Sequence, residues 1–170
     1  YDFKEFFVKK VKSILNENRM LNTKQPLLMK GFQTSGNLFD IQSDFTDKIQ
    51  KTIRLEIEKY RINFKNSEEG LIKKWPDEYT LYGWLISMKS GGQLQPHIHN
   101  QGWLSGSIYI NIPPKSEANS GNLVVSLGEE KDAIGTCINV KKIINVVTGS
   151  LVLFPASLTH YTIPFESEED

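Results

Sequence analysis

The chain has only one cysteine, Cys137, among its 170 residues, so an internal disulfide framework is excluded. It also has no apolar run close to the roughly 20 residues that a membrane-spanning helix needs. Its 20 basic and 20 acidic residues cancel, so no overall charge favours nucleic acid or an anionic membrane. These absences predict a cytoplasmic protein that acts on a small-molecule or peptide substrate, with neither nucleic acid nor membrane as a partner.

Histidine is scarce as well, and all three histidines fall into one pattern. His97 and His99 are separated by a single residue, and His160 closes the later segment 154–160. If His97 begins a β-strand, the two-residue period of the strand points the rings of His97 and His99 to one face. A histidine from a paired strand would then complete three ligands on one face of a metal ion. The pattern therefore predicts an iron site.

The expected site has no carboxylate ligand, because no Asp or Glu occurs between Glu78 and Glu117. Three neutral imidazoles leave the charge of a ferrous ion uncompensated, and a bound dianionic oxoacid would neutralise it. The alternative is that His97 and His99 are exposed polar residues at a strand rim while His160 is a hydrogen-bonded core histidine.

Length and composition predict one domain over residues 1–170, since 39% hydrophobic content suits a single core. Helical periodicity predicts amphipathic helices over residues 3–15 and 45–64, with Ser43 or Asp44 as the N-cap of the second. We expect this helical support, about residues 1–65, to cover a sheet.

After a loop at residues 65–77, the chain changes to short apolar runs separated by turn residues. We expect strands near residues 79–88, 106–112, 122–126, 142–147 and 150–154. Turns are expected at residues 91–92, 113–114, 120–121 and 148–149. This pattern is typical of a mostly β, α+β domain, in which a sandwich or jelly roll over about residues 78–170 carries the helices on one sheet.

Two segments around the histidines resemble a known family. Residues 96–110, Pro-His-Ile-His-Asn-Gln-Gly-Trp-Leu-Ser-Gly-Ser-Ile-Tyr-Ile, are similar to a motif of the 2-oxoglutarate and iron(II)-dependent oxygenases, in a prolyl-hydroxylase-like variant with His-x-His…His ligands. Residues 149–160, followed by Pro164 and Phe165, match the same group, as do Gln33–Phe39 and the strand around Trp84. The likeness runs from about Leu27 to the end of the chain.

The resemblance implies a double-stranded β-helix, or jelly roll, that holds Fe(II) through His97, His99 and His160. It also implies 2-oxoglutarate as cosubstrate, dioxygen as the oxidant and hydroxylation as the reaction. Alternate residues of the strand after the first ligand pair would line the oxoglutarate pocket, namely Ser105, Ser107 and Tyr109. Trp103 would either wall the substrate entrance or cap the sheet, and Trp84 would lie in the core.

The family places an arginine for the distal carboxylate of oxoglutarate shortly after the last histidine, whereas the arginines here are Arg19, Arg54 and Arg61. We therefore expect the natural protein to continue past Asp170, because the domain is otherwise truncated before its last strand. The resulting open sheet edge would allow a homo-oligomer. Two alternatives remain: a cupin-like dioxygenase with three histidines and no oxoglutarate, or a non-catalytic jelly-roll binding module.

Overall fold

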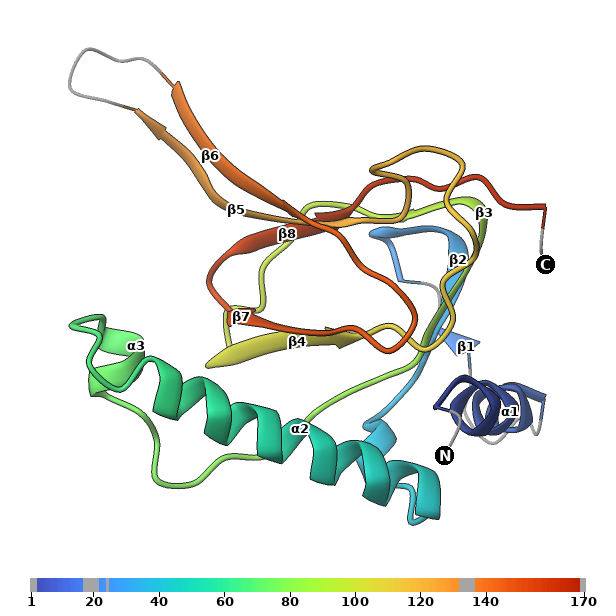
Figure 1. Ribbon diagram of the computed structural model, residues 1–170, viewed down its shortest axis with the longest axis horizontal. Coiled ribbons are helices and arrows are strands. Elements are labelled where there is room, and N and C mark those ends of the chain that lie inside the picture. Colours follow the sequence, from blue (N-terminus) through green and yellow to red (C-terminus); the bar gives the residue numbers. More distant parts are fainter. Residues whose placement is uncertain (1–2, 17–21, 24, 132–136, 169–170) are drawn as a thin grey trace.

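The computed structural model describes residues 3–16, 22–23, 25–131 and 137–168 (Figure 1). Its helices are α1 (Phe3–Asn16), the 3-10 turn η1 (Leu38–Asp40), α2 (Asp44–Asn63) and α3 (Gly70–Lys73). Its strands are β1 (Asn22–Thr23), β2 (Leu28–Thr34), β3 (Ile86–Leu94), β4 (Leu104–Ile108), β5 (Leu123–Lys131), β6 (Cys137–Ile144), β7 (Leu151–Pro155) and β8 (Thr159–Thr162). They form three antiparallel sheets with the orders β1-β2-β3, β4-β7 and β6-β5-β8. The predicted α+β class is confirmed.

Both long helices lie where the periodicity predicts them. α2 begins after Ser43, whose hydroxyl accepts a hydrogen bond from the backbone N–H of Thr46 at 3.2 Å. The Thr46 hydroxyl accepts one in return from the backbone N–H of Ser43 at 3.1 Å, which completes a capping box. No helix in the described ranges is both long and apolar enough to cross a membrane.

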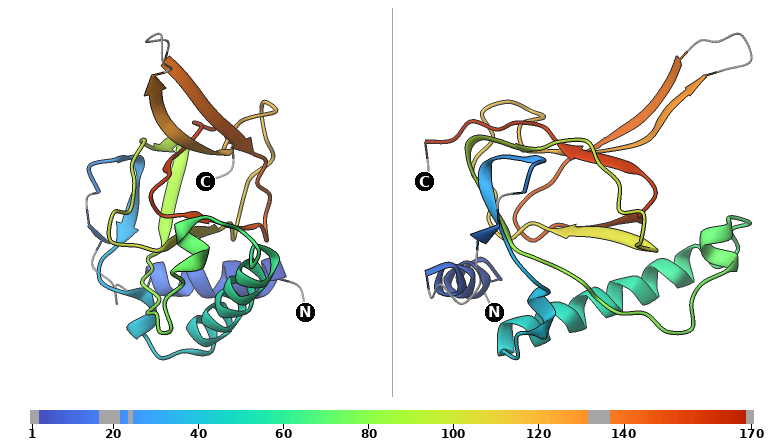
Figure 2. Two further views of the ribbon diagram at one scale, coloured as in Figure 1. Left: turned by 90° about the vertical axis from the view of Figure 1, so that its left-hand side faces the viewer. Right: turned by 180° about the vertical axis from the view of Figure 1, so that it is seen from behind.

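The β4–β7 sheet separates two apolar cores. On one side it packs against the helices: this helical core contains Leu38, Phe45, Ile49 and Leu85, with Ile108, Ile110 and residues of α1 and α2 around them. On the other side it faces the β6-β5-β8 sheet: this inner core contains Leu123, Val125, Val146 and Phe154, with Tyr109, Ile144, Val152 and Leu158 around them. Figures 1 and 2 show α2 running along the outer side of β4 and β7. The sheet is therefore buried on both faces.

The first long strand of the β-rich part differs from the prediction. A strand was expected over residues 79–88 with a turn at Gly91–Gly92, whereas β3 begins at Ile86 and passes through both glycines. Met29 pairs with Gln93 and Gly31 pairs with Met88, so β3 bulges outward opposite Lys30. Gly91 adopts φ +74° inside this bulge, and its N–H donates to the carbonyl of Phe165 at 2.6 Å. The two glycines therefore mark a bulge and not the end of a strand.

The bounds of other strands also differ from the predicted ones. β4 lies over residues 104–108 instead of 106–112, and β5 and β6 extend over residues 123–131 and 137–144 instead of 122–126 and 142–147. The chain after Ile108 leaves the ladder because Tyr109 exchanges backbone hydrogen bonds with the turn at Gly149 and Ser150. β1, β2, β8, η1 and α3 were not predicted at all.

One end of the molecule is framed by two projecting features. The β5–β6 hairpin extends away from the body on one side, and α3 with the end of α2 lies on the other (Figures 1 and 2). The connection from β3 to β4, which carries His97 and His99, runs across this same end in both views. The histidines therefore lie at an open end of the strand layers.

Candidate metal centre

An extended segment between β3 and β4 carries the first two histidines. His97 forms an isolated antiparallel bridge with His160 of β8: His97 N–H donates to His160 O at 3.1 Å, and His160 N–H donates to His97 O at 2.9 Å. His99 N–H donates to the carbonyl of Ala156 at 3.1 Å. The expected strand start is thus only a bridge, yet its extended backbone brings the histidines together.

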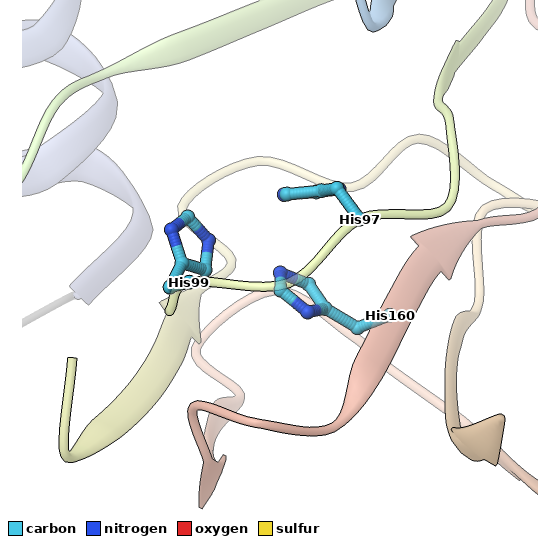
Figure 3. Close-up of side chains that lie close together, drawn as sticks. All are labelled: His97, His99 and His160. Atoms are coloured by element: carbon cyan, nitrogen blue, oxygen red, sulfur yellow. The ribbon is translucent and has the colours of Figure 1, made fainter. Parts of the chain in front are cut away.

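The three imidazoles converge in space, as Figure 3 shows. The ring centroids of His97 and His160 are 4.2 Å apart, and His99 lies 5.0 Å from each of them. One nitrogen of each ring lies within 4.8 Å of a nitrogen of the others. Adjacent ligands at a metal–nitrogen distance of about 2.1 Å are separated by about 3 Å, so small ring rotations would bring all three onto one ion. The residues therefore fit a single metal ion.

Backbone carbonyls orient two of the three rings. Nδ1 of His97 lies 2.8 Å from the carbonyl oxygen of Gln95, and Nδ1 of His160 lies 3.2 Å from that of Leu158. A carbonyl oxygen only accepts, so Nδ1 carries the proton in both rings. Nε2 of His97 and of His160 then keeps its lone pair for a metal, which is the outer hydrogen bonding usual for histidine ligands.

Burial keeps the imidazoles of His99 and His160 neutral. His160 is 5% exposed, and its burial lowers its pKa to about 4; the carbonyl of Leu158 opposes this shift, and the neighbouring His97 and His99 add to it. The pKa of His99 is also lowered, first by burial and then by the charge of His97. At neutral pH these two rings are therefore unprotonated, as a ligand must be.

The metal-ligand cluster that the described residues form consists of the three histidines alone. This agrees with the absence of acidic residues around them in the sequence. An ion held by these imidazoles would keep its full positive charge within the site. The site therefore suits an anionic ligand in the remaining coordination positions.

The residues predicted to line the cosubstrate pocket alternate along β4 as expected of a strand. Ser105 and Ser107 pair with Phe154 and Val152 of β7, both of which belong to the inner core or lie against it. Tyr109 packs into the same core, and its hydroxyl forms a hydrogen bond with Ser107. Burial raises the pKa of Tyr109 to about 12, against the smaller opposite effect of that hydrogen bond. These hydroxyls therefore lie on the face of β4 that also faces the layer of His160.

Trp103 lies at the start of β4 and reaches the helical part. Its indole N–H donates to the carbonyl of Leu71 in α3 at 3.0 Å, and its side chain is 40% exposed. Trp103 therefore ties α3 to the end of the molecule that carries the histidines. Its role at the substrate entrance stays a prediction.

Trp84 is the site residue that the sequence argument missed. It was expected in the core, but its side chain is only half-buried and its ring lies 5.7 Å from that of His99. Tyr82 packs edge-on against Trp84 at 5.9 Å and is 65% exposed. A signal was available, because Tyr82 and Trp84 alternate with Gly83 and Leu85, which marks an extended segment with one aromatic face.

Antiparallel backbone pairing brings a His-x-His pair and a distant histidine together, and this cluster fits an iron site of the His-x-His…His type. Residues 82–170, just over half of the chain, match the family model described as "Putative 2OG-Fe(II) oxygenase". The chain therefore belongs to this family of 2-oxoglutarate and iron(II)-dependent oxygenases. No curated protein and no solved structure matches it.

Proposed function

We propose that the protein is a non-haem iron(II), 2-oxoglutarate-dependent dioxygenase that hydroxylates a small molecule or a peptide side chain. His97, His99 and His160 would hold the metal. The observation that carries the proposal is the convergence of these three imidazoles, two of them with Nδ1 bonded to a backbone carbonyl and Nε2 available. Membership of the oxygenase family supports the same reaction class.

When bound, ferrous iron with 2-oxoglutarate and dioxygen supplies an oxidative decarboxylation that releases succinate and carbon dioxide and converts a substrate C–H into C–OH. The chain itself would bind and orient the reactants. Ser105, Ser107 and Tyr109 offer hydroxyl groups to a carboxylate of oxoglutarate. The pKa of Tyr109, raised by burial to about 12, keeps its hydroxyl protonated as a donor at neutral pH.

We further propose that the strand layers form a double-stranded β-helix. The supporting observation is that the β4–β7 sheet faces the β6-β5-β8 sheet across the inner core, with the histidines at one open end. Such an arrangement suits a site that must admit both a cosubstrate and a substrate.

The surroundings of the histidines favour an uncharged substrate group. Between Glu78 and Lys115 the only Lys, Arg, Asp or Glu is Lys89. The exposed large side chains on this segment near the site are Tyr82, Ile98 and Trp103. The aromatic and aliphatic side chains that this segment contributes would bind an apolar or ring-shaped group better than a phosphate or an acidic one.

One alternative function has its own support. A cupin-like dioxygenase also holds iron with three histidines, and its organic substrate coordinates the metal without oxoglutarate. Residues 62–170 contain no arginine, so none of these residues supplies a guanidinium for the distal carboxylate of oxoglutarate. This observation is the one that favours the alternative.

The test is an anaerobic titration of 2-oxoglutarate into the iron(II)-loaded natural protein, in which a visible charge-transfer band reports the chelated oxoacid. We expect the band in the wild type and in Tyr161→Phe, a control on β8 at the neighbouring position, and its loss in His160→Ala. Bound iron without a band would favour the cupin-like function. No iron affinity would leave the non-catalytic binding module.

A further inference from the structure

The three histidines are not held in the same way. The rings of His97 and His160 are each fixed by a hydrogen bond from Nδ1 to a backbone carbonyl, at 2.8 and 3.2 Å. Among the described residues, the ring of His99 has no hydrogen bond of this kind. An imidazole without such a bond can rotate and presents either nitrogen. Something else must orient His99 if it is to bind a metal.

Three rings pack against His99 instead, namely those of His97, His160 and Trp84. His160 stacks on His99 at 5.0 Å with an interplanar angle of 27°, and Trp84 lies at 5.7 Å with an angle of 43°. We propose that Trp84 is a positioning residue, which orients His99 by packing where His97 and His160 are oriented by hydrogen bonds. The inference rests on the proposed metal site and concerns only how its third ligand is held.

The chain around Trp84 is built to direct the indole toward His99. Gly83 N–H donates to the Asn37 side chain at 3.0 Å, and the carbonyl of Gly83 accepts from Leu38 N–H at 2.7 Å. A side chain at position 83 would meet the ring of Phe39 at 2.7 Å, so this position must be glycine for the segment to lie against η1. The backbone is therefore pinned directly before Trp84.

The residue after Trp84 is pinned as well. Leu85 is buried in the helical core, and its N–H donates to the hydroxyl of Thr34 at 3.0 Å while Thr34 N–H donates to its carbonyl at 3.0 Å. Since alternate residues of an extended chain point to opposite sides, Gly83 and Leu85 face the helices and Trp84 faces away from them. Tyr82 supports the indole from its other side. The backbone on both sides of Trp84 is thus held by hydrogen bonds, with the indole directed toward His99.

The direct test is a double-mutant cycle read by Co(II) affinity and by the visible bands of bound Co(II). We expect Trp84→Leu to weaken Co(II) binding about tenfold, the size typical of lost outer-sphere support, and to move the bands toward those of His99→Ala. Trp84→Phe, which keeps an aromatic ring, should restore most of the affinity. Trp75→Leu is the matched control, since Trp75 stacks on Tyr60 of α2.

The effect of Trp84→Leu must be compared between the wild-type protein and the His99→Ala variant. If Trp84 acts through His99, Trp84→Leu should change Co(II) affinity less than about twofold when His99 is already alanine. An equal loss in both backgrounds would mean that the indole only supports the fold, and it would overturn the proposal. An unchanged affinity in the single variant would overturn it equally.

A second measurement does not depend on Trp84→Leu folding. Bound Co(II) quenches tryptophan emission at short range. The indole of Trp84 packs against the ring of His99, with 5.7 Å between the ring centroids. We expect Trp84→Phe to remove most of the quenching and Trp75→Phe to leave it. Unchanged quenching in Trp84→Phe would show that the indole does not lie over the metal site.

The outcomes separate this inference from the proposed function. Wild-type protein that binds Co(II) through the histidines but gives no oxoglutarate band would defeat the oxoglutarate assignment and leave the role of Trp84 open to the same cycle. Co(II) binding that is insensitive to all three histidines would defeat the metal site and the inference together.

Discussion

The two faces of the β4–β7 sheet are built for different purposes. The helical core has an apolar cluster in which Phe45 of α2 is only 1% exposed, whereas the inner core includes Tyr109 and its Phe154 lies 4.8 Å from the ring of His160. β4 contributes to both cores, because Ile108 faces the helices while the residues on either side of it, Ser107 and Tyr109, face the inner core. The period of two residues therefore lets β4 contribute to stability with one face and to the candidate site with the other.

The largest effect should come from the helical core. We expect Phe45→Ala to lower the free energy of unfolding by about 3–5 kcal/mol, because it leaves a cavity in a closed apolar layer. The folded fraction should keep its Co(II) affinity within about twofold. Urea unfolding followed by circular dichroism, with a Co(II) titration below the transition, checks both parts. If the folded Phe45→Ala protein bound Co(II) much more weakly, the helical core would also support the candidate metal site, and the two faces would not have separate roles.

Next in size is the loss of a ligand. His160→Ala should weaken Co(II) binding by at least about a hundredfold, since only two imidazoles remain and these are on one segment. Tyr161→Phe, at the next position of β8, is the control and should bind as the wild type does. Isothermal titration measures the affinities, and a His160→Ala protein with wild-type affinity would refute this ligand set.

The metal-free protein should also become less stable in acid, because the buried imidazole of His160 resists protonation in the folded state. The pKa of folded His160, about 4, lies below the usual value of 6.5, so between these values the unfolded chain binds a proton that the folded chain does not. Stability should therefore fall as the pH drops from about 6.5 toward about 4, by at most about 1.4 kcal/mol per pH unit from this group. Urea unfolding in the presence of a chelator at pH 7, 5.5 and 4.5 measures the slope. His160→Gln should flatten it, and an unchanged slope would assign the effect to other groups.

The smallest expected effects concern two neighbouring residues at the end of β4, Ile108 and the following Tyr109. Tyr109→Phe should weaken oxoglutarate binding to the iron(II) protein by about tenfold and cost about 1 kcal/mol of stability, as expected for one buried hydrogen bond. Ile108→Val, on the opposite face, should cost about 1 kcal/mol and leave oxoglutarate binding unchanged. Titration of the charge-transfer band compares the two. Equal effects on oxoglutarate would mean that the faces are not separate.

The convergence of the three candidate ligands was predictable, because they are the only histidines of the sequence and because their spacing has a geometric meaning on strands. The alternate hydroxyl residues of β4 were predictable for the same reason, as the period of two depends on the backbone alone. Trp84 was not recognised, because its position relative to His99 depends on how Gly83 and Leu85 are held by η1 and β2. The alternation of Tyr82 and Trp84 with Gly83 and Leu85 indicates an aromatic face in the sequence, but the contacts that bring this face to His99 leave no local pattern.

The helices were predicted closely, since the apolar period and the Ser43 cap both lie within the segment that they describe. The strands were predicted less well. β2, Leu-Met-Lys-Gly-Phe-Gln-Thr, has no alternation of apolar and polar residues because its pairing with β3 shifts at Lys30, which has φ +48°. A bulge in one strand displaces the pattern of both, so neither sequence alone reveals it.

The paired backbone of His97 and His160 has a consequence for folding. Because these two residues exchange both of their backbone hydrogen bonds, this bridge also fixes the distance between their Cα atoms, from which the two rings project. An ion held by both rings would act as a removable cross-link that closes the loop from residue 97 to residue 160, and it would oppose unfolding through the lost entropy of the open chain. The chain has a single cysteine and so no internal disulfide, but a bound ion would provide a cross-link. Its contribution to the free energy of unfolding would rise with the concentration of free metal.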